Sequence, residues 1–102
     1  MERSLPVVWS VEAEQGPGVG KLELLPDRLR LEGRRRGRRV VDEFQLSEVG
    51  ATHFGRSEAE RLGGRSTLVI ERPARRSLLV CALFGFGALA ELADQLSAWP
   101  LQ

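Results

Sequence analysis

The sequence has few of the residues that build metal centres and covalent cross-links. It contains one cysteine, Cys81, and one histidine, His53. Zinc sites made by a protein alone use three or four such ligands, so a site of that kind is excluded, and no metal or cofactor is expected. A lone cysteine also excludes a disulfide within the chain. The longest stretch without a polar residue is Leu78 to Ala90, well short of the roughly 20 residues that a membrane helix needs.

The charge balance gives no general attraction to polyanions, because 15 basic and 14 acidic residues leave a net charge of +1. The hydrophobic content of 42% is that of a soluble globular protein, and 102 residues suffice for a single domain spanning 1–102. Residues 1–12 lack the pattern of a signal peptide, so a cytoplasmic location is expected. Nearly all of the basic residues are arginine, and this bias points to a bacterium with a GC-rich genome.

Period-two alternation of apolar and polar residues, which is typical of half-buried strands, dominates the chain. Seven short segments are predicted to be strands: 7–14, 21–25, 28–32, 40–46, 49–55, 67–71 and 77–83. Asp42 interrupts the apolar face of its segment and predicts a β-bulge there. Residues 33–38 are predicted to be a basic connector, and residues 56–64 a loop or at most a helical turn.

The period changes to that of a helix near the C-terminus. The residues that fall on one helical face are Leu89, Leu92, Ala93, Leu96 and Trp99. Gly87 can start this helix and Pro100 ends it. The sequence therefore predicts a mainly β fold, a seven-stranded antiparallel barrel or sandwich capped by one C-terminal helix.

Three parts of the chain resemble bacterial pleckstrin-homology-like (PH-like) domains of the GRAM type. They are the strand, tight turn and strand of Gly20 to Leu31, the step Phe44-Gln45-Leu46-Ser47-Glu48-Val49, and the last strand leading into the helix. The resemblance covers nearly the whole chain. It implies binding of a phosphoinositide, a peptide or a protein, or a scaffold role.

The densest charge in the sequence lies between the third and fourth predicted strands. The residues concerned are Arg34, Arg35, Arg36, Arg38 and Arg39. They are candidate contacts for an acidic partner, either a protein or an anionic surface. Nucleic acid is not expected, because no aromatic residues interleave with the arginines to stack on bases. The alternative is a charged hairpin that only keeps a strand edge soluble.

A second, weaker basic set consists of Lys21, Arg28 and Arg30. The residue types match a basic pattern that, according to the resemblance to PH-like domains, would bind a phosphoinositide. The intervening turn, however, carries Asp27, whose charge would repel a phosphate. Solvated charges on an outer strand face are the competing interpretation.

Residues for catalysis are lacking. His53 has no nucleophile motif near it, and Asp42 and Glu43 are adjacent, so they point to opposite faces of a strand. We therefore expect a non-enzymatic binding or assembly module. Two alternatives stay open: a self-associating scaffold that pairs through strand edges, with the apolar residues Val8, Leu25, Val69 and Leu79 outside the core, and a small-molecule binder at the barrel mouth.

Overall fold

The structure is a computed structural model that describes residues 3–11, 16–63, 65–73, 75–83 and 86–98. Its elements, in chain order, are β1 (Arg3–Val11), β2 (Gly18–Leu24), β3 (Arg28–Arg35), β4 (Arg38–Gln45), η1 (Leu46–Glu48), β5 (Thr52–Phe54), η2 (Glu58–Glu60), β6 (Leu68–Ile70), β7 (Leu78–Ala82) and α1 (Phe86–Ala98). Within the described ranges, no helix combines the length and the apolar character needed to cross a membrane.

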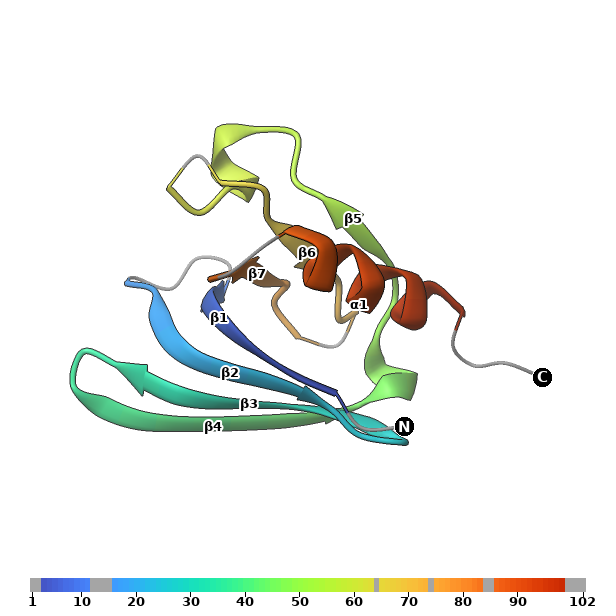
Figure 1. The fold of residues 1–102 in the computed structure, drawn as a ribbon, viewed down its shortest axis with the longest axis horizontal. Helices are drawn as coiled ribbons and strands as arrows, with labels where there is room; N and C mark the ends of the chain where they lie inside the picture. Colours follow the sequence, from blue (N-terminus) through green and yellow to red (C-terminus); the bar gives the residue numbers. More distant parts are fainter. Residues whose placement is uncertain (1–2, 12–15, 64, 74, 84–85, 99–102) are drawn as a thin grey trace.

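The seven strands form one antiparallel sheet in the order β4-β3-β2-β1-β7-β6-β5. This confirms the predicted mainly β fold with one C-terminal helix. The sheet is not closed, since β4 and β5 are its two ends. It folds over, so that β2, β3 and β4 lie on one side of the molecule and β5, β6 and α1 on the other (Figure 1).

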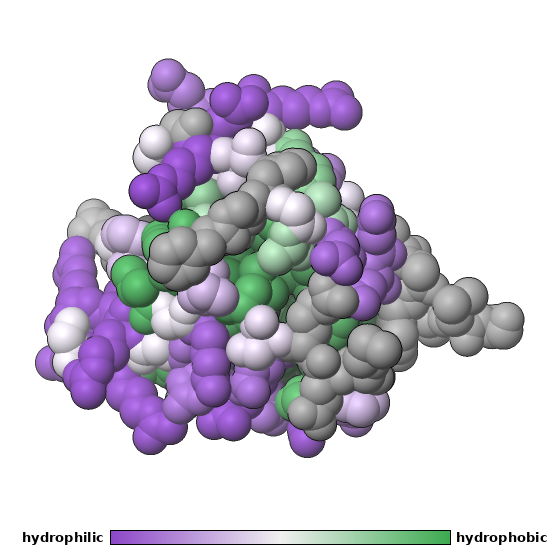
Figure 2. All heavy atoms as spheres, viewed as in Figure 1, coloured by the Kyte–Doolittle hydropathy of each residue, from purple (hydrophilic) through white to green (hydrophobic). Residues whose placement is uncertain are grey.

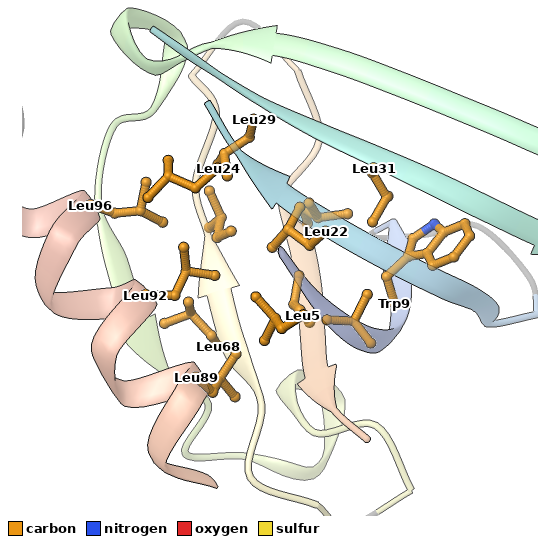
Figure 3. Close-up of a cluster of buried hydrophobic side chains, with 14 of the residues drawn as sticks. Leu5, Trp9, Leu22, Leu24, Leu29, Leu31, Leu68, Leu89, Leu92 and Leu96 are labelled. Carbon is orange, nitrogen blue, oxygen red and sulfur yellow. The ribbon is translucent and has the colours of Figure 1, made fainter. Parts of the chain in front are cut away.

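The core fills the space between the two halves of the folded sheet. Leu22, Leu29 and Leu31 come from the first half, and Leu68, Ile70 and Val80 from the second. The helix supplies Leu89, Leu92 and Leu96, which point toward these residues (Figure 3). The predicted apolar face of the helix is thereby confirmed for these leucines, whereas Trp99 lies outside the described residues.

Strand β1 begins earlier than the alternation predicted, and it passes through Pro6. Proline lacks the N–H that a ladder needs, so it is normally confined to edges. Here β1 pairs with β7 only as far as Val7, opposite Ala82, and the carbonyl of Pro6 accepts the N–H of Leu83 just beyond. The Pro6 nitrogen, which carries no hydrogen, therefore faces β7 at the point where pairing between β1 and β7 has ended. Strand β1 can still pair with β2 through this residue.

The β3–β4 hairpin is longer and more regular than predicted. Pairing runs without interruption from Arg28 opposite Gln45 to Arg35 opposite Arg38, so the bulge predicted at Asp42 is wrong. Most of the predicted connector belongs to the strands, and the turn itself is Arg36-Gly37. Both turn residues have positive φ, 54° and 78°, as in the type I′ turn that matches the twist of paired strands.

Two apolar residues that were expected outside the core are buried. Val69 and Leu79 are 4% and 8% exposed, so they offer no surface for a partner. Val8 and Leu25 are half-buried. Exposed large apolar side chains are found elsewhere, at Val19 and Val41.

Trp9 fits against a strip of backbone that has no side chains. A Cβ atom added to Gly18 would lie 2.5 Å from Cη2 and 2.6 Å from Cε2 of the Trp9 ring, and one added to Gly33 would lie 2.8 Å from Cζ3. These separations are far inside van der Waals contact. The two glycines therefore make room for the indole, which is fully buried in the core.

We predict that Gly18→Ala destabilises the fold by about 1–3 kcal/mol, the usual cost of overpacking a filled core. Gly87→Ala is the matched control, because Gly87 lies in α1 and an added Cβ would meet nothing within 4 Å. Alanine there should stabilise the protein by less than about 1 kcal/mol through its higher helix propensity, because Gly87 lies in the first turn of α1. Urea unfolding followed by circular dichroism checks both values. Equal effects of the two substitutions would contradict the close packing of Trp9.

Candidate anion-binding site

The five predicted arginines do not form one patch, because strand alternation separates them. On β3 and β4 the core face carries Leu31 and Phe44, so Arg35 and its partner Arg38 lie on that face. Arg34 and Arg39, paired with each other, lie on the outer face. Arg36 occupies the turn. Hydrophilic residues gather at this end of the molecule, at the left of the view in Figure 2.

Of these five residues, only Arg35 lines a pocket on the core side of the sheet. The pocket has a volume of about 410 Å³. Its walls come from β1, β3, β4 and the segment after β6, through the residues Trp9, Val11, Leu31, Arg35, Val40, Val41, Asp42, Arg72, Arg75 and Arg76. Four guanidinium groups and one carboxylate leave a charge of +3 on its lining. Such a lining is suited to an anion.

Sequence analysis missed three of these four arginines. Arg72, Arg75 and Arg76 belong to the connection between β6 and β7, which lies between the predicted strands 67–71 and 77–83. Their signal was present as three arginines within five residues. Nothing in the sequence showed that this turn lies beside β4.

Arg72 is the most deeply buried of the four, with a side chain that is 2% exposed. Its Nε donates to the carbonyl of Arg76 at 2.9 Å, and its Nη1 donates to Oδ2 of Asp42 at 3.2 Å. The guanidinium lies 4.9 Å from the centre of the Phe44 ring. Burial lowers the pKa of Arg72, the charge of Arg75 lowers it further, and Asp42 raises it. These contacts fix the direction in which the group points.

Asp42 holds the pocket together through both of its oxygens. Oδ1 accepts a hydrogen bond of 2.8 Å from Nη2 of Arg75, while Oδ2 accepts the one from Arg72. Asp42 faces the core side from the edge strand β4, whereas the two arginines follow β6 near the opposite edge. We call this group of three residues the Asp42 clamp. It explains why an acid interrupts the apolar face of β4.

The second basic set is largely neutralised by neighbouring acids on the outer face of the sheet. Lys21 lies 4.0 Å from Glu23, and Arg28 and Arg30 lie 3.6 Å and 3.9 Å from Glu43. Arg39 is also paired, because it forms an ion pair with Glu32 and thereby holds the pKa of that carboxyl below its usual value. These ion pairs are exposed, and none of their residues lines the arginine pocket.

A second hollow, of about 530 Å³, lies between the start of β2 and the segment that follows η2. It is lined by Val8, Ser10, Gly16, Pro17, Arg61, Leu62, Gly63, Arg65 and Cys81. The Cys81 thiol lies at its base and donates to the carbonyl of Ser66 at 3.2 Å. The volume is in the range of small-molecule sites. Its position, on the outer face of β1 and β7, differs from the barrel mouth considered above.

His53 is enclosed by two carboxylates that are distant in sequence. Its Nε2 is 2.9 Å from Glu60, and its Nδ1 is 3.4 Å from Glu71. The hydrogen bond to His53 lowers the pKa of Glu60. The cluster ties η2 to β5 and to the end of β6, so a structural role accounts for it. Among the described residues, no three or more histidine, cysteine, aspartate or glutamate side chains are arranged so that they could hold a metal ion.

Comparison with known proteins supports the fold and nothing finer. No family model matches the chain, and no curated protein matches it. A solved structure, the C-terminal domain of an unknown protein from Leishmania infantum, superposes with a TM-score of 0.67 at 12% identity, covering 93% of this chain and 82% of that one. An SsgA-like sporulation-specific cell division protein from Thermobifida fusca superposes with a TM-score of 0.42 at 11% identity, covering 99% and 82%. The first likeness shows a similar β fold.

We predict that Asp42→Ala lowers the free energy of unfolding by about 3 kcal/mol, because it leaves the buried Arg72 without its carboxylate. Glu43→Ala provides a matched control on the same strand. Glu43 is exposed on the other face, and its ion pairs should be worth less than about 1 kcal/mol. Denaturant unfolding of dilute protein measures both changes. A loss for Asp42→Ala no larger than that for Glu43→Ala would mean that the clamp does not hold the sheet.

Proposed function

We propose that this protein is a non-enzymatic binding module that takes an acidic group of a partner at its arginine pocket. The observation that carries the proposal is that Arg35, Arg72, Arg75 and Arg76 all line one pocket, which contains a single carboxylate, that of Asp42. Guanidinium groups bind phosphate and carboxylate oxygens through paired, charge-assisted hydrogen bonds. An excess of three positive charges favours a ligand that carries more than one negative charge.

The buried contacts of Arg72 support binding with little rearrangement. Its two fixed hydrogen bonds and its position over Phe44 set the guanidinium before any ligand arrives. Side chains held in this way lose little entropy when a ligand binds. The exposed arginines around the turn, Arg34, Arg36 and Arg38, add positive charge to the same end of the molecule. They would attract an acidic partner over a longer distance.

The proposal also covers two predictions made from the sequence, the resemblance to PH-like domains and the cytoplasmic location. Seven antiparallel strands followed by one C-terminal helix agree with what a PH-like domain would have. We propose that the chain is a bacterial, cytoplasmic domain of this kind. Its partner would be a protein with an acidic segment or an anionic surface, as the charge of the pocket favours.

The test uses two anionic probes, vesicles of phosphatidylcholine with phosphatidylserine and a polyglutamate peptide. The variant Arg35→Ala with Arg76→Ala removes two pocket charges and keeps the Asp42 clamp intact. Each basic group is worth about 1 kcal/mol at an anionic surface, so we expect affinity to fall about thirtyfold. Vesicle flotation and titration calorimetry, at low and near-physiological salt, measure the change.

The matched control is Arg56→Ala with Arg65→Ala, which removes the same charge from exposed positions outside the pocket. It should bind almost as well as the unchanged protein. Plain phosphatidylcholine vesicles should not bind. If neither anionic probe binds, or if both double variants weaken binding equally, the pocket is not the site and the proposal is wrong.

A further inference from the structure

The two ends of the sheet differ in how much free backbone they offer. Strand β5 has three residues, whereas β4 has eight. A long edge strand presents a row of unpaired N–H and C=O groups and is a template for pairing with another strand. In the described part of the chain, no strand pairs with the free side of β4. This edge is therefore available to a partner.

The outer face of β4 carries a symmetric pattern of side chains. Val41 lies at its centre and is 47% exposed, which is unusual for a large apolar residue on a charged face. Arg39 precedes it by two residues and Glu43 follows it by two, so both point to the same face. Opposite charges at equal distances on either side of an apolar residue form a self-complementary sequence.

We propose that β4 pairs with β4 of a second copy of this chain, antiparallel and about a two-fold axis through Val41. In this register Val41 lies opposite Val41 of the second copy, and Arg39 lies opposite Glu43 of that copy. The two-fold axis repeats the second pair on the other side of the centre. The result is one continuous sheet of fourteen strands from two seven-stranded sheets.

The charges of β4 disfavour most of the neighbouring registers. A shift by one residue would place the core face of one copy beside the outer face of the other, which no two-fold axis normal to the sheet allows. Shifting the pairing by an even number of residues in one direction brings first Asp42 opposite Asp42 of the second copy, and then Glu43 opposite Glu43. One step in the other direction brings Val40 opposite Val40 and Arg38 opposite Asp42, whose two oxygens already accept from Arg72 and Arg75. A second step brings Arg39 opposite Arg39. Like charges directly opposite each other are destabilising, so of these registers only those centred on Val41 and Val40 avoid them, and only the Val41 register adds an ion pair between groups outside the Asp42 clamp.

The new ion pairs would extend pairs that are already present. Within one chain Arg39 contacts Glu32 on the neighbouring strand, and Glu43 contacts Arg30. Pairing of two copies joins these into a row of alternating charges across four strands: Arg30, Glu43, then Arg39 and Glu32 of the second copy. Networks of this kind contribute more than isolated surface pairs.

The first test is cross-linking at the two-fold axis. Opposite residues in antiparallel strands have Cα atoms about 4.5–5.5 Å apart, within the range that a disulfide spans, so Val41→Cys should form a disulfide between copies under mild oxidation. Val19→Cys is the matched control, because Val19 is similarly exposed, at 52%, and lies on β2 away from the edge. Mass spectrometry of the cross-linked peptides identifies the bond. Equal rates for the two variants would overturn the proposal.

The second test reverses charges and restores them. Arg39→Glu and Glu43→Arg each place like charges opposite each other, and each should weaken dimerisation about tenfold or more in analytical ultracentrifugation. Mixing the two variants restores both ion pairs, so the mixture should associate as tightly as the unchanged protein. Lys21→Glu, a charge reversal on β2, should have little effect.

The unchanged protein is expected as a concentration-dependent dimer of 11.3 kDa chains. A monomer at the highest concentration that stays in solution, or a mixture that associates no better than its components, would overturn the pairing. Arg39 and Glu43 do not line the arginine pocket, so a failure of the charge-reversal test is distinguishable from a failure of the binding function proposed above.

Discussion

The Asp42 clamp is the contact on which the shape of the sheet depends. Strand hydrogen bonds stop at β4 on one side and at β5 on the other, so backbone pairing alone leaves the two ends apart. Asp42 on β4 joins Arg72 and Arg75 from the connection after β6, and Phe44 lies under both guanidinium groups. Charged groups this deeply buried are stable only when they are paired. Side-chain contacts thus connect the two halves of the sheet at a place where no backbone pairing connects them.

The same contact also makes the pocket. The segment that carries Arg72 is held against β4, so its arginines line one pocket together with Arg35 of β3. The residues that hold the two ends of the sheet together thus overlap with the residues of the proposed binding site. Asp42 offsets part of the positive charge of the pocket, which under our proposal leaves a preference for multiply charged groups.

Sequence alone predicted what depends on local alternation, namely the strands, the helix and its buried leucines. It failed where two distant segments meet. The acid at position 42 was assigned to a bulge because its partners lie 30 and 33 residues away and give no local pattern. The five arginines between positions 34 and 39 suggested one patch, yet alternation divides the strand residues between two faces, and only Arg35 reaches the pocket. The enclosure of His53 by Glu60 and Glu71 was invisible for the same reason.

The central position of β1 has a consequence for the order in which the chain assembles. Strands β1 to β4 pair with their neighbours in sequence, so this meander needs only short loops to close. The other edge of β1 pairs with β7, which is synthesised after all the other described strands. During synthesis on the ribosome, one edge of the strand that carries Leu5, Val7 and Trp9 stays unpaired until β7 has emerged. The nascent protein is therefore most exposed to misassembly at what becomes the middle of the finished sheet.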